Sequence, residues 1–193
     1  MKNQQFSELE TIVLGGGCFW CTEAIFSRIH GVIEVQSGYA NGDLPSPQYE
    51  QVCTGDTGHA EVVKVVFDPQ KIELRKLLAV FFAIHDPTTI NRQGHDVGTQ
   101  YRSAIYTTTD AQHAIALEIL HQLASSHEFS QPLATELQPL QHFWPAESDH
   151  QNYFARHPQQ SYCHWVIAPK VQKFLCTFEH LVVDEHLVVQ NSE

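Results

Sequence analysis

Three consecutive glycines, residues 15–17, most constrain how this chain can fold. They follow the β-branched apolar run 11–14 and precede the segment CFWCTEAIFSRIH, which begins at Cys18. The run predicts a strand that the glycines end, and the apolar spacing after Cys18 predicts a helix that closes at Gly31. The sequence therefore predicts a strand-to-helix turn with Cys18 opening the helix.

The order of the later elements predicts the fold class. Strands are expected at 32–35, 61–67 and 103–106. A helix is expected after Asp68-Pro69, with Asp68 as its cap and proline in the first turn, and with an apolar face made of Leu74, Leu77, Leu78 and Phe81. Further elements are expected as helices at 110–124 and 171–181 and a strand at 133–137.

Strand, helix, strand, strand, helix, strand is the order of a ferredoxin-like split βαβ domain. This is an α+β fold, an antiparallel or mixed sheet with helices packed on one face. We expect one catalytic domain over residues 1–193, with a core at about 11–170 and a C-terminal helical extension at about 171–193. Long polar loops at 38–60 and 86–102 are expected to form a site.

The charge balance limits the partners. The chain has 22 acidic and 11 basic residues and a net charge of −11, so phosphates and anionic lipids should be repelled. We therefore expect neither nucleic acid nor membrane binding. No apolar run approaches the roughly 18 residues that cross a bilayer, and the segment MKNQQFSELE does not read as a secretory signal. The expected location is the cytoplasm.

Five cysteines are present: Cys18, Cys21, Cys53, Cys163 and Cys176. An odd number in a reducing compartment argues against a disulfide framework and favours free, catalytic or metal-bound thiols. The thirteen histidines are scattered and no second C-x-x-C pair follows the first, so no metal site is expected.

Cys18 is the best placed of these thiols. At a helix start, unpaired backbone N–H groups and the helix dipole should lower its pKa and favour the nucleophilic thiolate. The opposing interpretation is a glycine turn followed by a buried, inert cysteine. Cys21 lies one helical turn further on, so a disulfide between the two is possible. The C-x-x-C pair alone is also compatible with a thioredoxin-like dithiol.

Four motifs carry a resemblance to a known family. GGGCFWCTE (15–23), YEQVCTGDTGHAEVV (49–63), GHDVGTQYRSAIY (94–106) and DHQNY (149–153) resemble, in this order, the A-type peptide methionine sulfoxide reductases, over roughly residues 11–170. The resemblance implies a ferredoxin-like core, no cofactor and reduction of the S epimer of methionine sulfoxide, in proteins, peptides or the free amino acid. It also implies recycling by thioredoxin.

The resemblance also assigns roles to residues. It implies that Cys18 attacks the sulfoxide sulfur and that Glu61 protonates the sulfoxide oxygen. It implies that the hydroxyls of Tyr49 and Tyr101 hydrogen-bond that oxygen and that Asp96 is a supporting acid. Phe19 and Trp20 match the apolar wall that receives the substrate methyl group.

Elementary chemistry makes this assembly sensible. A sulfoxide oxygen is a poor leaving group until it gains a proton, and a glutamic acid kept protonated by burial can supply one. Two tyrosine hydroxyls can stabilise charge that develops on the oxygen, and an aromatic pocket suits a methyl group on sulfur.

The resolving thiol is left open by the sequence. A sulfenic acid on Cys18 should condense with a nearby thiol. Some family members use a cysteine at the position of Cys21, and others use one in a glycine-rich tail, where Cys163 could stand. The segment HWVIAPKVQKF after Cys163 lacks such glycines, which favours Cys21 first and Cys163 as a second partner. Cys53 and Cys176 are expected to play no redox part.

Two other classes of function remain compatible with parts of the sequence. A dithiol oxidoreductase acting on disulfides would need neither Glu61 nor the two tyrosines. A silent reader would bind oxidised methionine without reducing it. In every case we expect a monomer.

Overall fold

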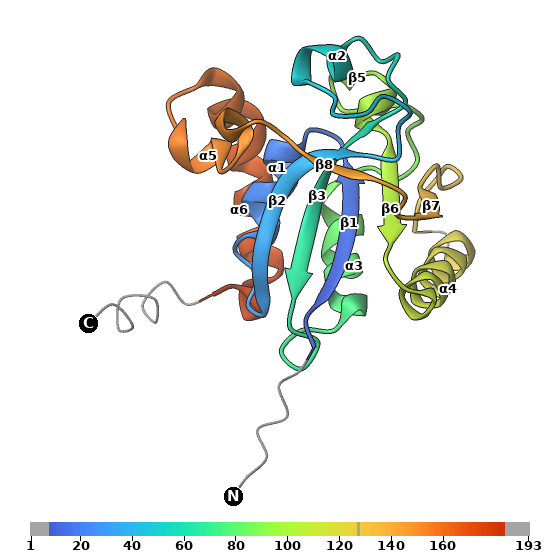
Figure 1. Cartoon of the computed structure of the whole chain (residues 1–193). Helices are drawn as coiled ribbons and strands as arrows, with labels where there is room; N and C mark the ends of the chain where they lie inside the picture. Colours follow the sequence, from blue (N-terminus) through green and yellow to red (C-terminus); the bar gives the residue numbers. More distant parts are fainter. Residues whose placement is uncertain (1–7, 127, 184–193) are drawn as a thin grey trace, which may run out of the picture.

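A six-stranded sheet organises the chain (Figure 1). The structure, a computed structural model, describes residues 8–126 and 128–183. The strands of the sheet are β1 (Glu10–Gly16), β2 (Val32–Ala40), β3 (Ala60–Phe67), β6 (Ser103–Thr107), β7 (Glu136–Pro139) and β8 (Phe143–Pro145). Their order is β7-β6-β1-β3-β2-β8, and only β6 and β7 are parallel neighbours. The predicted α+β class with a mixed sheet is confirmed.

The helices and the smaller elements occupy the connections. The helices are α1 (Phe19–Phe26), α2 (Tyr49–Cys53), α3 (Leu74–Ile84), α4 (Asp110–Ser126), α5 (Tyr153–Arg156) and α6 (Ala168–Thr177). A small hairpin consists of β4 (Arg92–Gln93) and β5 (Asp96–Val97). Short 3₁₀ turns cover Thr99–Tyr101, Ser148–His150 and Glu179–Leu181, and a π-helical turn covers Cys163–Ile167.

The main core lies between one face of the sheet and the helices. On β1, Ile12 and Leu14 point to this face and stand opposite Val65 and Val63 of β3. They pack in one buried cluster with apolar side chains of α1, α3 and α6. Val13 lies between them and points to the opposite face, in a smaller cluster. The alternation along β1 therefore fixes which face of the sheet the helices cover.

Two strands are longer than expected. β1 continues through Gly15 and Gly16, which pair with Ala104 and Ser103, and the turn begins only at Gly17, where φ is +88°. Glycine remains in the ladder because the neighbouring strands come close: a Cβ on Gly15 would lie 3.2 Å from the Glu61 carbonyl oxygen. β2 likewise continues to Ala40, so the loop expected from residue 38 begins later.

The predicted cap of the third helix was wrong. Helix α3 begins at Leu74 with Glu73 as its N-cap. Asp68 instead closes a separate turn, in which its carboxylate accepts a hydrogen bond from the Gln70 amide at 2.9 Å and its carbonyl accepts one from Lys71. An Asx turn competes with helix initiation for the same side-chain oxygen, and here the turn is formed.

The C-terminal part also differs in its bounds. Helix α6 begins at residue 168, before the expected 171, and ends at Thr177, after which residues 179–181 form a separate 3₁₀ turn. Pro169 in the first turn of α6 explains the earlier start, because proline lacks only an N–H that the helix does not need there. Strand β7 is shifted to 136–139 from the expected 133–137. Residues 184–193 of the expected extension lie outside the described residues.

The turn at Gly17 gives a test of this arrangement. Gly17→Ala places a methyl group 2.6 Å from Cβ and Cγ of Gln93 on a backbone with positive φ. We expect the free energy of unfolding in urea to fall by about 3 kcal/mol. Gly94→Ala is the matched control, since φ is +60° but nothing lies within 4 Å of the added carbon, and it should cost about 1 kcal/mol. Equal losses for both variants would contradict the packing of Gln93 on Gly17.

Candidate active site

The predicted site residues meet at one end of the sheet. Figure 1 shows α2 and β5 at this end, beside the turn that joins β1 to α1. Cys18 lies in that turn, Glu61 is the second residue of β3, and Tyr49 begins α2. Asp96 is in β5, and Tyr101 ends the 3₁₀ turn that follows it. Segments from both long polar loops therefore reach the thiol.

Cys18 is the N-cap of α1 and is only 6% exposed. Burial raises the pKa of its thiol well above the ordinary value, and the hydrogen bond to Cys21 raises it further. The lowered pKa expected from the helix start is therefore not found. One reason is that the first free amide of the helix, that of Phe19, donates to Glu61.

Glu61 is buried with 1% of its surface exposed, against the turn at residues 17–18 that carries Cys18, the predicted nucleophile (the nucleophile turn). Its Oε2 accepts the hydrogen bond from the Phe19 amide at 3.2 Å, and its Oε1 has no protein partner within the described residues. Burial raises the pKa of this carboxyl to about 8, and the charges of Asp96 and Cys21 act in the same direction. At neutral pH the group is a carboxylic acid with one free oxygen atom.

The two tyrosines lie around this carboxyl. Burial raises the pKa of Tyr49 and of Tyr101, and for each the negative charge of Glu61 is the next cause. Both hydroxyls therefore stay protonated as hydrogen-bond donors. The charge of Cys18 also raises the pKa of Tyr101, so this hydroxyl is near enough to both Glu61 and Cys18 to interact with their charges.

Aromatic rings form a cage next to the thiol. Trp20 stacks on Tyr153 with ring centroids 3.7 Å apart, and the ring centroids of Tyr49 and His150 are 4.2 Å apart. The ring centroid of Phe19 lies 6.4 Å from that of Tyr49 and 5.7 Å from that of His150. The cage suits an apolar group that carries a polarised sulfur atom. Within the described chain, Trp20 Nε1 and His150 Nδ1 are buried and have no partner.

Two carboxylates hold the cage in place, and sequence reasoning missed both. Glu147 accepts the Tyr49 amide at 2.7 Å and the Tyr39 hydroxyl at 2.9 Å. Glu23, buried in α1, accepts the amide of Asn152 at 2.9 Å and that of Tyr153 at 3.3 Å. Glu23 lies in the first motif and residues 152–153 in the fourth, so their co-occurrence was an available signal.

Tyr162 is a further residue that sequence reasoning missed. Its hydroxyl donates to Asp96 at 2.7 Å and also contacts the Cys18 thiol, where its hydrogen bond lowers the pKa of that thiol. Asp96 therefore has two links to the site, its hydrogen bond to Tyr162 and the effect of its charge on Glu61. The available signal was its position directly before Cys163, a cysteine already under consideration.

The five cysteines are all free thiols, and they differ in position. Cys21 is buried in the first turn of α1, and the hydrogen bond from Cys18 lowers its pKa. Cys163 is fully buried in the π-helical turn. Burial is the main cause that raises the pKa of its thiol, and the charge of Cys21 raises it further. Cys53 is exposed at the end of α2 with its thiol near the Tyr49 hydroxyl, and Cys176 is exposed on α6.

Two further properties concern the described residues as a whole. Across 8–126 and 128–183, no group of three or more His, Cys, Asp or Glu side chains could hold a metal ion. None of the helices in these ranges is long and apolar enough to cross a bilayer.

A site of this kind supports thiol chemistry on a substrate whose polar atom can accept a proton. Comparison with known proteins identifies the family to which such a site belongs. The family model described as peptide methionine sulfoxide reductase matches residues 10–180. The peptide methionine sulfoxide reductase MsrA of Polynucleobacter asymbioticus is 51% identical over 186 residues, which are 96% of this chain and 98% of the relative.

Solved structures agree with this match. Methionine sulfoxide reductase A of Corynebacterium diphtheriae has a TM-score of 0.77 and 37% identity, over 85% of this chain and 81% of the other. Mxr1 of Saccharomyces cerevisiae in complex with Trx2 has a TM-score of 0.53 and 27% identity, over 79% and 89% of the two chains. The chain belongs to the peptide methionine sulfoxide reductase family, and its resemblance to the A type is confirmed.

The contact between Tyr162 and Cys18 leads to a prediction. Tyr162→Phe removes a hydrogen bond that lowers the pKa of the thiol, so Cys18 should react more slowly with iodoacetamide at pH 8, by about threefold to tenfold. Peptide mass spectrometry of the alkylated chain measures this rate at Cys18. The control is Tyr153→Phe, which loses a hydroxyl bonded at 2.9 Å to Gln160 and should leave the rate unchanged. A similar slowing in both variants would contradict the contact.

Proposed function

We propose that Cys18 and Glu61 carry the reduction of methionine sulfoxide, which is the activity of this family. The observation that supports this most strongly is the buried Glu61 carboxyl, which has a pKa of about 8 and a free Oε1 beside the nucleophile turn. Such a group can give a proton to the sulfoxide oxygen at neutral pH. Exchange between disulfides would have no use for it.

The first step transfers the oxygen atom. Cys18 Sγ attacks the sulfoxide sulfur as the oxygen takes the Glu61 proton, and the thiol proton of Cys18 passes to Glu61. Transfer of the hydroxyl group to Cys18 breaks the S–O bond of the substrate. The products are methionine and a Cys18 sulfenic acid, so the thiol is oxidised and the sulfoxide is reduced. Tyr49 and Tyr101 donate hydrogen bonds to the oxygen as negative charge develops on it.

The aromatic cage selects the substrate. We assign Phe19 and Trp20 to the wall that receives the methyl group, as the resemblance implied, and Asp96 to the support of Tyr162. With the methyl group in the cage and the oxygen at Glu61, one sulfur configuration presents its free face to Cys18. The family resemblance implies that this configuration is S, and we propose the S epimer of methionine sulfoxide as the substrate, in proteins, peptides or the free amino acid.

The second step removes the sulfenic acid. We assign Cys21 as the first resolving thiol, because the two side chains already share a hydrogen bond and the pKa of Cys21 is lowered. Its sulfur displaces the hydroxyl group from Cys18, forming a disulfide and releasing water. Cys163 is the second partner that can take over the disulfide. A thioredoxin dithiol then restores the thiols, which the complex of the yeast relative with Trx2 supports.

The architecture and setting fit the same function. We propose a ferredoxin-like split βαβ core made of β1, α1, β2, β3, α3 and β6, which the spatial order β6-β1-β3-β2 supports. We propose one catalytic domain over the whole chain, working as a monomer because a single chain carries every group of the site. Recycling by a dithiol needs a reducing compartment, so we propose the cytoplasm.

The role of Glu61 predicts a defect in the first step only. Glu61→Gln should keep the fold and bind substrate, but it should form the sulfenic acid about 100-fold more slowly. In the parent enzyme the same rate should be steady below pH 7 and fall as Glu61 ionises above about pH 8. Single-turnover kinetics of methionine release measures both. Glu50→Gln, an exposed residue of α2, is the control, and an unchanged first step in Glu61→Gln would remove this residue from the mechanism.

The role of Cys21 predicts a stalled cycle. Cys21→Ser should release one equivalent of methionine per enzyme and then stop with thioredoxin, because the second thiol is needed only after oxygen transfer. Cys163→Ser should show a milder loss, and Cys18→Ser should give no burst at all. Burst kinetics and mass spectrometry of the disulfide check this order. If Cys163→Ser stalls while Cys21→Ser turns over normally, the resolving role belongs to Cys163.

A further inference from the structure

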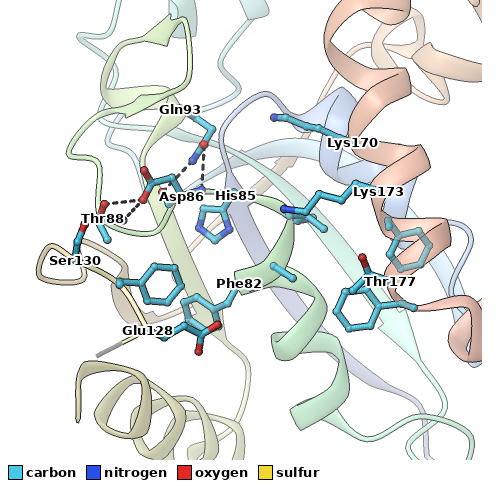
Figure 2. Close-up of a pocket in the computed structure, with 15 residues that line it drawn as sticks. Phe82, His85, Asp86, Thr88, Gln93, Glu128, Ser130, Lys170, Lys173 and Thr177 are labelled. Atoms are coloured by element: carbon cyan, nitrogen blue, oxygen red, sulfur yellow. Dashed lines mark hydrogen bonds between the residues drawn. The ribbon is translucent and has the colours of Figure 1, made fainter. Parts of the chain in front are cut away.

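A cavity of about 720 Å³ lies away from the aromatic cage, between α3, α6 and the segment that follows α4 (Figure 2). Phenylalanines form its apolar part: Phe82 comes from α3, Phe129 from the segment after α4, and Phe174 and Phe178 from α6 and its end. The volume is within the range of about 300–1,000 Å³ that small-molecule sites occupy. None of the residues assigned to methionine sulfoxide reduction lines it.

Two lysines give this apolar cavity a positive end. Lys170 and Lys173 stand on α6, and Figure 2 shows their side chains reaching toward the loop that carries His85 and Gln93. In the described part of the chain neither ammonium group makes an ion pair or a hydrogen bond. The chain has only 11 basic residues against 22 acidic ones, and two of the 11 stand on this cavity wall.

Within the described residues, the other polar side chains of the cavity form no ion pair with these two lysines. His85 uses Nδ1 on the Phe81 carbonyl and Nε2 on Ser103, and burial lowers its pKa to about 4, so it is uncharged at neutral pH. The Asp86 carboxylate keeps its charge, because hydrogen bonds from the hydroxyl and amide of Thr88, at 2.6 and 2.9 Å, lower its pKa, and these bonds hold it on its own loop. Glu128 lies at the opposite end of the cavity from Lys170 (Figure 2).

The cavity lies directly behind the nucleophile turn. A Cβ on Gly16 would lie 3.5 Å from the His85 ring, and Gln93 packs on Gly17. The Gln93 amide also fixes the cavity loop, because it donates to the Asp86 carbonyl at 3.0 Å and accepts from the Asp86 amide at 3.1 Å. A molecule in the cavity would therefore touch side chains that rest on the two residues preceding Cys18.

We propose that this cavity binds a small organic carboxylate with an aromatic body, the carboxylate at Lys170 and Lys173 and the ring among the phenylalanines. A carboxylate pairs with the two ammonium groups, and the ring replaces water on the apolar walls. This second site shares no residue with the substrate cage, so the proposal goes beyond the proposed function.

Isothermal titration calorimetry of the full chain with 4-phenylbutanoate tests the proposal, with 4-phenylbutanamide as the uncharged probe of the same shape. We expect a Kd of about 1 mM or tighter for the carboxylate, and binding about tenfold weaker for the amide. An excess of methionine should not compete. Equal binding of the two probes, or no binding of the carboxylate up to about ten times the expected Kd, would overturn the proposal.

Three variants locate the probe. The double change Lys170→Met with Lys173→Met should weaken carboxylate binding at least about tenfold, whereas the control pair Lys71→Met with Lys76→Met, exposed and outside the cavity, should not. Thr177→Trp fills the cavity without changing charge and should also abolish binding. The melting temperature of each variant verifies that it is folded. Unchanged binding in Thr177→Trp, or equal losses in the two lysine pairs, would show that the carboxylate does not bind in the cavity.

Discussion

The hydrogen bond from the Phe19 amide to the Glu61 carboxyl joins the two halves of the site. Phe19 begins α1 and Glu61 stands in β3, so the bond gives a partner to an orphan amide of the helix start and holds the acid against the nucleophile turn. Close approach of the strands makes this possible, because Gly15 on β1 and Tyr39 on β2 flank Glu61. The same strands also position the aromatic cage, because Glu147 accepts hydrogen bonds from both the Tyr39 hydroxyl and the Tyr49 amide.

Burying this acid has a cost that depends on pH. The pKa of Glu61 is about 8 in the folded chain and near 4.5 when exposed, so between these values the folded state holds a proton that the unfolded state has lost. Stability therefore falls as pH rises through this window, by a total on the order of a few kcal/mol. The surrounding core of fully buried apolar side chains, among them Leu14, Phe19 and Val63, offsets the cost. The site thus keeps a destabilising group because only its neutral form can donate the proton.

Much of this arrangement could be predicted from local patterns. A β-branched apolar run located β1, a valine-rich run located β3, and the glycines located the turn before Cys18, because these signals lie within a few residues. The contacts that define the site are long-range. Tyr162 reaches Asp96 across 66 residues, and Glu147 reaches Tyr49 across 98. Neither side chain has a local signature, and the cap assigned to Asp68 failed because a turn and a helix start use the same oxygen. The raised pKa of Cys18 was missed for a similar reason, since burial depends on the packing of distant segments.

That raised pKa is consistent with the chemistry. With Cys18 and Glu61 both neutral at rest, the buried site carries no unpaired negative charge where desolvation would be most costly. During oxygen transfer the acid gives its proton to the substrate and receives the thiol proton, so Glu61 and Cys18 are both uncharged again when the step ends. The thiolate needs to exist only while the sulfoxide oxygen is being protonated. Cys21, whose pKa is lowered by the hydrogen bond from Cys18, is by contrast the more acidic thiol of the pair. The two thiols are three residues apart in the sequence and differ in pKa. This difference separates the oxygen-transfer step from the disulfide step.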